Sequence, residues 1–108
     1  MKSVILSIDT SDRTKSVVGI EVYSKVEKLE VDTPLGSGTA VLTAIETKLT
    51  QLGLTLKDIT GIRVATGPGS YTGLRVGAAI ANALGWMFGI PVNSKPVGMF
   101  VSPRYTHP

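Results

Sequence analysis

The sequence predicts an α/β fold in which a mixed β-sheet is covered by two main helices. Three observations favour this fold. Short β-branched runs fill the first third of the chain, and apolar residues with helical spacing follow from Val41 to Leu52. A glycine-rich corner then separates another short apolar run from a long helical segment with almost no charge. A length of 108 residues suits one domain with one modest core.

The first three elements are expected to be antiparallel strands. Residues 4–8 are apolar and β-branched, and they end at the turn-forming residues 9–12. Residues 17–23 predict a second strand. Residues 26–31 mix apolar and charged side chains on both faces, which is typical of a strand at the edge of a sheet. The short polar connections favour a meander.

The period of the apolar residues then changes to that of a helix. One helical face is formed by Val41, Leu42, Ile45, Leu49 and Leu52. Ser37 or Thr39 is suited to cap the start of this helix, and Gly53 is suited to the left-handed residue that ends one. Residues 55–58 resemble a capping-box turn ahead of a strand over residues 61–66.

A second helix is expected roughly from Thr72 to Phe88, followed by a short final strand at residues 92–94. The chain is irregular from Pro96 onward, so we place one domain at residues 1–95 and an irregular tail at residues 96–108. The expected order is β-β-β-α-β-α-β. With right-handed crossovers this order gives a mixed sheet and resembles one lobe of a ribonuclease H-like domain.

The glycine corner, residues 67–73, has two physical interpretations. Its backbone N–H groups can face an anion, or its glycines can allow very close packing. The spacing G-x-G-x-x-x-G is one residue off the dinucleotide fingerprint, and the Walker A lysine is missing. Nucleotide binding or phosphotransfer through Asp9, Gly67 and Gly69, with Arg75 nearby in sequence, is therefore kept as the alternative, and it would require ATP and Mg²⁺.

The second helix carries small residues every four positions, at Gly73, Gly77, Ala81, Gly85 and Gly89. Glycine inside a helix costs roughly 0.5–1 kcal/mol relative to alanine, which close contact would offset. No charge lies between Arg75 and Lys95, so one side of the helix is expected to cover the sheet and the other to contact a partner. Tight packing of this helix against the chain's own first helix, with no second protein, is the alternative. The expected interface residues are Leu42, Ile45, Leu49, Tyr71, Thr72, Gly73, Arg75, Val76, Gly77, Ile80, Ala81 and Leu84.

Composition excludes several functions. The chain has no cysteine, and its single histidine is His107, so neither a metal-ligand cluster nor a catalytic triad can be assembled. We therefore expect no metal and no catalytic residues. All eight acidic residues lie within residues 1–58, and only four basic residues follow. Four separated charges do not predict an RNA-binding stripe. No signal peptide or membrane span is favoured, so a cytoplasmic protein is expected.

The segment from Asp58 to Gly77 resembles the signature of the bacterial TsaB family. Residues 8–11 and 89–92 match the same pattern, so the resemblance covers about residues 3–93. It implies a lobe of the acetate kinase/Hsp70/actin superfamily. It also implies a non-catalytic scaffold that pairs through its two helices with the catalytic subunit TsaD during synthesis of threonylcarbamoyladenosine in tRNA. The accessory ATPase TsaE and tRNA would be reached through the complex, and a homodimer is implied when TsaD is absent.

The sequence departs from the TsaB pattern in three places. Family members usually carry a second lobe of similar size. They often have a histidine where this chain reads Ser37-Gly38-Thr39, and they continue into another helix where this chain reads Ser94-Lys95-Pro96. One lobe cannot complete the nucleotide cleft that the superfamily forms between two lobes. No bound cofactor and no catalysis are therefore expected of this chain.

Overall fold

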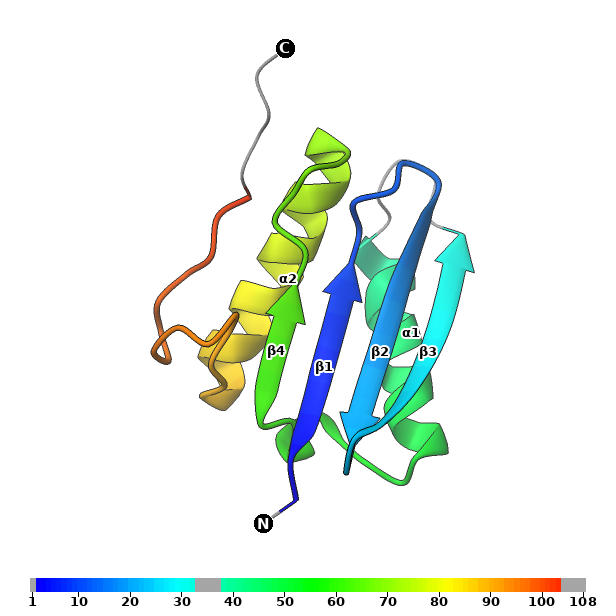
Figure 1. Ribbon diagram of the computed structural model, residues 1–108, viewed down its shortest axis with the longest axis vertical. Coiled ribbons are helices and arrows are strands. Elements are labelled where there is room, and N and C mark those ends of the chain that lie inside the picture. The colour runs from blue at the N-terminus through cyan, green and yellow to red at the C-terminus, as the bar shows by residue number, and fades with distance from the viewer. Residues whose placement is uncertain (1, 33–37, 104–108) are drawn as a thin grey trace.

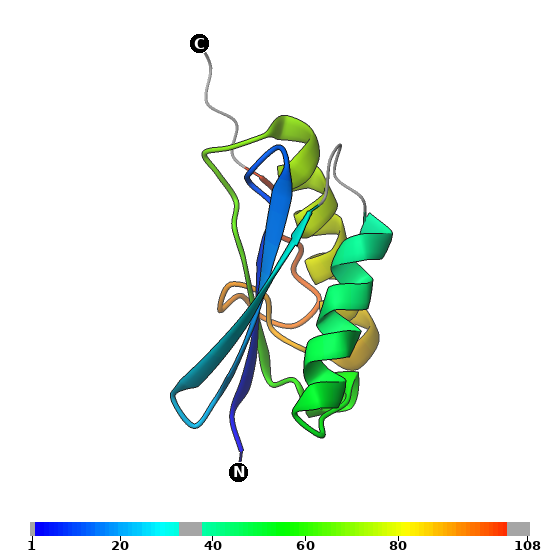
Figure 2. The ribbon, with the colours of Figure 1, turned by 90° about the vertical axis from the view of Figure 1, so that its right-hand side faces the viewer.

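The computed structural model describes residues 2–32 and 38–103. Its helices and strands are β1 (Val4–Asp9), β2 (Lys15–Val22), β3 (Lys25–Asp32), α1 (Gly38–Gln51), the short 3-10 helix η1 (Leu56–Asp58), β4 (Gly61–Val64) and α2 (Tyr71–Phe88). The sheet forms one layer and both helices cover the same face of it (Figures 1 and 2). The predicted α/β class and the order of elements through α2 are confirmed.

The sheet has the strand order β3-β2-β1-β4. β1 pairs antiparallel with β2 and parallel with β4, so the centre of the sheet is the first strand of the chain. β3 pairs only with β2 and lies at the edge, as its mixed faces predict. Parallel pairing of β1 and β4 requires a crossover, which α1 supplies.

The predicted final strand at residues 92–94 does not form. Val92 makes a single parallel bridge with Ile62, and the backbone of Asn93 then turns into the left-handed region at φ 51°. The amide of Asn93 takes the place of the missing strand: its Oδ1 accepts from the N–H of Val64 at 2.8 Å, and its Nδ2 donates to the carbonyl of Val64 at 3.1 Å. The edge of β4 is therefore closed by a side chain, and β4 itself ends at Val64 instead of residue 66.

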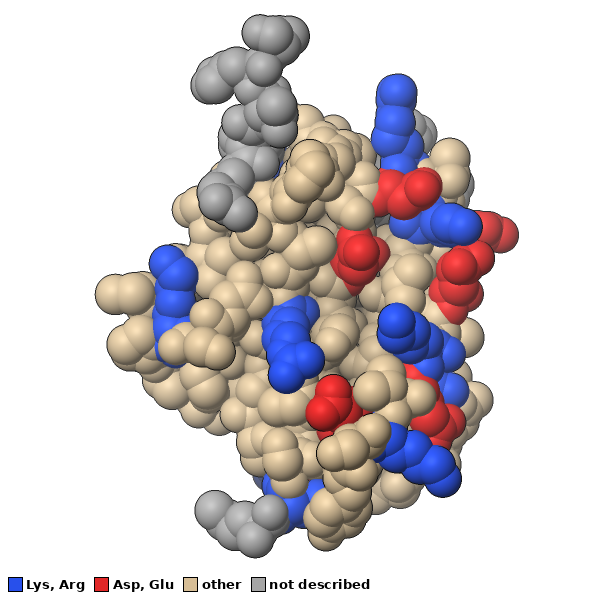
Figure 3. All heavy atoms as spheres, in the orientation of Figure 1, with Lys and Arg blue, Asp and Glu red and all other residues tan. Residues whose placement is uncertain are grey.

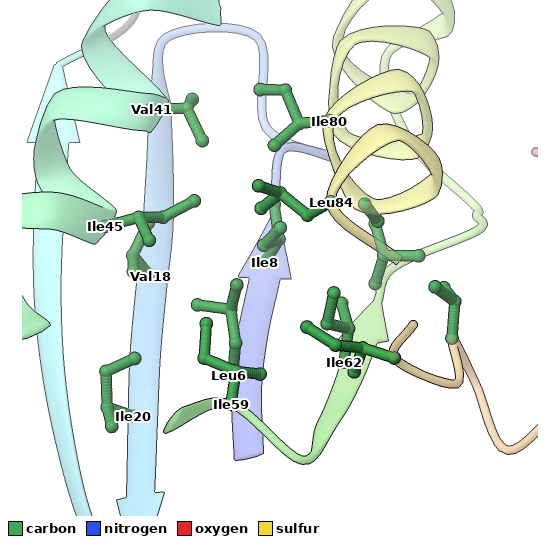
Figure 4. Packing of buried hydrophobic residues seen from close by; sticks show 14 of the residues in the cluster. Leu6, Ile8, Val18, Ile20, Val41, Ile45, Ile59, Ile62, Ile80 and Leu84 are labelled. Atoms are coloured by element: carbon green, nitrogen blue, oxygen red, sulfur yellow. The ribbon is translucent and has the colours of Figure 1, made fainter. Parts of the chain in front are cut away.

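The core lies between the sheet and the two helices. Leu6 and Ile8 of the central strand face α1 and α2, and every side chain labelled in the close view of this layer points into the same space (Figure 4). The buried residues of the neighbouring elements that complete this layer are Val18, Ile20, Val41, Ile45, Ile59, Ile62, Ile80 and Leu84. Alternation along β1 leaves Ile5, Ser7 and Asp9 on the open face of the sheet.

The open face of the sheet carries charges of both signs. Both red and blue side chains are visible over β2 and β3 in Figure 3. Two ion pairs between neighbouring strands are Lys15–Glu30 at 3.6 Å and Arg63–Glu21 at 3.9 Å. Pairs this exposed contribute little to stability. These charged side chains keep the open face in contact with solvent. The apolar core of the described residues lies on the other face, under the helices.

The predicted residues at the ends of α1 can be compared with the structure where those residues are described. Gly53 adopts φ 72°, as expected of the residue that ends a helix. The capping box is confirmed, because the N–H of Thr55 donates to Oδ2 of Asp58 at 2.8 Å. The prediction that Ser37 caps the helix falls outside the described residues, and Thr39 lies within the first turn, not at the cap.

The chain after α2 is irregular through residue 103, but it is attached to the helix. Val101 is buried, its N–H donates to Oδ1 of Asn82 at 2.9 Å, and its carbonyl accepts from Nδ2 of Asn82 at 2.8 Å. One amide therefore holds the C-terminal segment against α2. None of the helices in the described part of the chain has the length and apolar character that a membrane crossing requires.

Replacement of Asn82 by alanine should release the C-terminal segment. The variant loses both bonds to Val101, and we expect a destabilisation of about 1–3 kcal/mol together with faster proteolysis within residues 96–103. Urea unfolding and limited proteolysis measure the two effects. Ser102→Ala, an exposed change in the same segment, is the matched control. Equal stability and equal cleavage in Asn82→Ala would show that this attachment is unimportant.

Candidate functional site

The glycine corner lies directly against the loop that follows β1. Gly67 and Gly69 adopt φ values of 133° and 156°, which side-chain-bearing residues rarely do. A Cβ on Gly69 would stand 2.7 Å from the carbonyl oxygen of Ser11, and the N–H of Ser70 donates to that same oxygen at 2.8 Å. The corner thus needs glycine so that two stretches of backbone can touch.

The start of α2 is fixed by Ser70 and Thr10. Oγ of Ser70 caps the helix by accepting from the N–H of Gly73 at 3.2 Å. Thr10 is buried at 2% exposure, and its hydroxyl donates to the carbonyl of Gly73 at 2.6 Å. A Cβ on Gly73 would overlap the carbonyl oxygen of Thr10, and a Cβ on Gly77 would overlap its hydroxyl oxygen. The first two turns of α2 therefore pack directly against Thr10.

The row of small residues faces the interior of the chain. Ala81 is fully buried, and a Cβ on Gly85 would stand 2.7 Å from Cγ2 of Val92 and 2.9 Å from the carbonyl oxygen of Ile90. Gly89 ends the helix in the left-handed conformation. The expectation that this row contacts a second protein is therefore wrong. The packing is internal, as the alternative expects, but the first helix is not its partner. Gly73 and Gly77 contact Thr10, and Gly85 contacts residues 90–92.

The twelve predicted interface residues divide into two groups. Seven are buried within the chain itself: Ile45, Leu49, Gly73, Gly77, Ile80, Ala81 and Leu84. The other five remain accessible on the outer side of the two helices, and we call them the helix-pair surface: Leu42, Tyr71, Thr72, Arg75 and Val76. Only this second group can meet another molecule without rearrangement of the fold.

The helix-pair surface spans the place where the two helices meet. The start of α1 lies against α2, because a Cβ on Gly38 would stand 3.7 Å from Cγ1 of Val76 and 3.9 Å from Cδ1 of Ile80. Leu42 follows Gly38 by one turn on the same side of α1 and is 40% exposed. The surface therefore combines an aliphatic centre with the polar first turns of α2.

Arg75 and Tyr71 form one unit on this surface. Nη1 of Arg75 donates to the hydroxyl oxygen of Tyr71 at 3.2 Å, and the guanidinium carbon lies 5.6 Å from the centroid of the ring. Such stacking contributes about 0.5–1 kcal/mol at exposed sites. Its effect here is to hold two long side chains in a defined position on the exposed first turns of α2.

Sequence reasoning missed Thr10, Ala79 and Ala83. The sequence marks Thr10 only as part of a turn. In the structure it directly follows a buried strand and contacts Gly73 and Gly77. Ala79 and Ala83 follow Arg75 at four-residue steps and are exposed. A second row with the same period as the glycine row was thus visible in the sequence, and it is this row that faces outward.

The residues of the alternative nucleotide site lie close together, but much of their hydrogen bonding is used within the chain. Oδ1 of Asp9 accepts from the N–H of Ser11 at 3.0 Å and from its hydroxyl at 2.5 Å. The N–H groups of Ser70, Gly73 and Leu74 are bonded to Ser11 and Ser70. Within residues 2–32 and 38–103, no three acidic or histidine side chains gather as a metal site would require.

This arrangement of sheet and helices is the predicted ribonuclease H-like α/β fold. The solved structure described as YeaZ from Pseudomonas aeruginosa superposes with a TM-score of 0.77 at 23% identity, over 93% of this chain and 44% of that one. The predicted fold class is confirmed by this likeness.

The model of the family described as "TsaD: tRNA N6-adenosine threonylcarbamoyltransferase" matches residues 38–94, so the chain belongs to this family. The predicted resemblance to TsaB is also confirmed. The tRNA threonylcarbamoyladenosine biosynthesis protein TsaB of Bacillus subtilis is 30% identical over 83% of this chain. A tRNA N6-adenosine threonylcarbamoyltransferase of Vesicomyosocius okutanii is 45% identical over 47% of this chain and 15% of its own length. The chain spans 39% of the Bacillus subtilis protein, less than half of its length.

Replacement of Gly77 by alanine tests the packing of α2 against Thr10. Glycine to alanine inside a helix ordinarily stabilises a protein by about 0.5–1 kcal/mol. Here the new methyl group meets the buried hydroxyl of Thr10, so we expect a net destabilisation of about 1 kcal/mol or more. Urea unfolding measures the change, with exposed Ala79→Ser as the control, expected within about 0.5 kcal/mol of the wild type. A more stable Gly77→Ala variant would contradict the packing described.

Proposed function

We propose that this chain acts as a non-catalytic, TsaB-like scaffold that pairs with a TsaD-like enzyme and supports the formation of threonylcarbamoyladenosine in tRNA. The observation that carries the proposal is the helix-pair surface, an accessible surface with a single charged side chain at the junction of α1 and α2. It lies within residues 38–94, the part of the chain that matches the TsaD family model. The proposed pathway comes from the names of two relatives, a tRNA threonylcarbamoyladenosine biosynthesis protein TsaB and a tRNA N6-adenosine threonylcarbamoyltransferase.

The chemistry of the helix-pair surface suits a protein partner. Leu42 and Val76 offer apolar area at its centre, and tyrosine and arginine are the residue types enriched where interfaces hold most of their binding energy. The exposed Ala79 and Ala83 allow another helix to approach α2 closely. Because Arg75 is the one formal charge, docking desolvates few ions.

The proposed role leaves the chemistry to the partner. TsaE and tRNA would be reached through the TsaD-like subunit. The same surface is available to a second copy of this chain when that subunit is absent. The buried Thr10 has a structural part in this role, since it fixes the side of α2 that the partner meets.

Two charge substitutions on the helix-pair surface should abolish pairing. We expect the full chain to co-purify with a TsaD homologue from the same source, and Leu42→Glu combined with Arg75→Glu to weaken the affinity by at least about 100-fold. Pull-down and titration calorimetry measure this. Lys57→Glu, a charge reversal on η1, is the control and should bind as the wild type does. Full binding by the double variant would refute the proposed surface.

The proximity of Asp9 to the glycine corner, through Ser11, favours one other function, a nucleotide-binding or phosphotransfer lobe. Because the N–H groups of Ser70 and Gly73 in the corner, and of Leu74 after it, are bonded inside the chain, we expect Mg-ATP to leave the melting temperature of the isolated chain unchanged. Thermal melts and calorimetry test this expectation. Micromolar binding that disappears in Asp9→Ala would favour the nucleotide function over the scaffold.

A further inference from the structure

A hollow lies between the end of the β2–β3 hairpin and the end of α1. Figure 2 shows the hairpin bending away from this end of the helix. The cavity between them has a volume of about 250 Å³ and a mostly apolar wall. We call it the hairpin hollow, and its lining residues are Ile20, Val22, Tyr23, Lys25, Glu27 and Leu52.

The floor of the hairpin hollow is apolar, and the backbone beneath it is hydrogen-bonded. Ile20 is fully buried, and Val22 and Leu52 are half-buried against the core. The two residues of β2 lie on a strand that pairs with β1 on one side and with β3 on the other. At the end of α1, the carbonyl oxygens of residues 48–50 accept from the N–H groups of residues 52–54. The floor therefore suits a hydrocarbon and does not suit the polar backbone of a peptide.

The size of the hairpin hollow limits what it can hold. Sites for drug-sized ligands occupy roughly 300–1,000 Å³, and this cavity is slightly smaller than that range. A short alkyl chain matches both its volume and its apolar wall, whereas a nucleotide matches neither.

The rim of the hairpin hollow has one unmatched cation. Nζ of Lys48 lies 3.5 Å from Oε1 of Glu27, so the acidic residue that lines the hollow already has a counter-charge. Among the residues that the structure describes, none pairs with the ammonium group of Lys25 or bonds to the hydroxyl of Tyr23. The rim therefore favours an anionic head group that accepts hydrogen bonds from these two donors.

The turn that carries Tyr23 is built from residues that are unusual in it. Tyr23 and Ser24 have φ values of 52° and 66°, in a two-residue turn that ordinarily contains asparagine and glycine. Bulky residues rarely adopt this conformation. The tyrosine side chain is 74% exposed, so burial within the chain does not offset the strain. A strained residue at the rim of a cavity is typical of a ligand clamp.

We propose that the hairpin hollow binds a medium-chain fatty acid. The alkyl chain lies on the apolar floor, and the carboxylate accepts hydrogen bonds from Nζ of Lys25 and from the hydroxyl of Tyr23. Leu52 of the hollow follows the last residue of α1, whereas Leu42 of the helix-pair surface belongs to the first half of that helix. The fatty acid site is therefore separate from the surface proposed for the TsaD-like partner.

Titration of the full chain with octanoate, followed by NMR of the backbone amides, tests this proposal. The shifts should centre on the hairpin hollow and saturate with a Kd of about 0.1–1 mM, as expected of so small a ligand. Lys25→Gln should weaken octanoate binding about threefold to tenfold and leave the weaker binding of neutral octanol unchanged. Leu52→Gln should weaken both. Lys28→Gln is the matched control, because Lys28 lies on the open face beside Gly19.

Tyr23→Asn separates ligand binding from the stability of the turn. Asparagine adopts positive φ more readily than tyrosine, so the melting temperature should rise while the affinity for octanoate falls at least about threefold. A residue with a structural role alone would not give these opposite changes. Circular dichroism melts show which variants fold, and the exposed Lys25 and Tyr23 variants decide the test if Leu52→Gln does not.

Absence of a saturable shift at about 10 mM octanoate would overturn the proposal. So would an equal response to acetate, which marks an adsorbed ion only, or octanol binding as tightly as octanoate. Unchanged octanoate affinity in both Lys25→Gln and Leu52→Gln would overturn it as well. The double variant Leu42→Glu and Arg75→Glu should bind octanoate as the wild type does while losing the TsaD-like partner, so the failure of either proposal can be told from the failure of the other.

Discussion

The contact between Thr10 and the first turns of α2 is the constraint on which the rest of this lobe depends. The threonine follows the central strand, is buried, and touches both Gly73 and Gly77. Because neither glycine has a side chain, the helix lies against the loop after β1 at backbone distance. This contact sets the rotation of the helix about its own axis. It therefore decides which residues complete the core and which remain for other molecules.

The outward side of α2 follows from that rotation. With the glycine row turned inward, Arg75, Ala79, Ala83 and Trp86 are left exposed along the opposite side. The N-terminal part of this side joins α1 at Gly38 and forms the helix-pair surface, whereas its C-terminal part joins the segment held by Asn82. One helix thus offers two surfaces of different chemistry, the first polar and aliphatic and the second aromatic. Neither requires the chain to bind a nucleotide.

Most of the fold could be predicted from the sequence, because apolar periodicity reports directly on burial. The apolar, β-branched run of β1, the mixed faces of β3 and the helical spacing after Val41 predicted the correct elements. The inward direction of the glycine row could not be predicted, since spacing shows that a close contact exists but not what makes it. The partner of Gly73 and Gly77 is a single threonine, Thr10, more than sixty residues away in the chain. The absence of the final strand could not be predicted from the sequence either, because the side-chain amide of Asn93 makes the hydrogen bonds to β4 that a strand would have made.

Side-chain footprinting with hydroxyl radicals, with and without a TsaD homologue from the same source, tests the central claim most directly. The claim is that packing of α2 against Thr10 leaves the helix-pair surface, at the junction of α1 and α2, free to contact a TsaD-like partner. It predicts that Tyr71 and Leu42 lose reactivity in the complex, while Tyr23 at the β2–β3 turn, 74% exposed, keeps its reactivity. Protection of Tyr23 with Tyr71 and Leu42 unchanged would contradict the account.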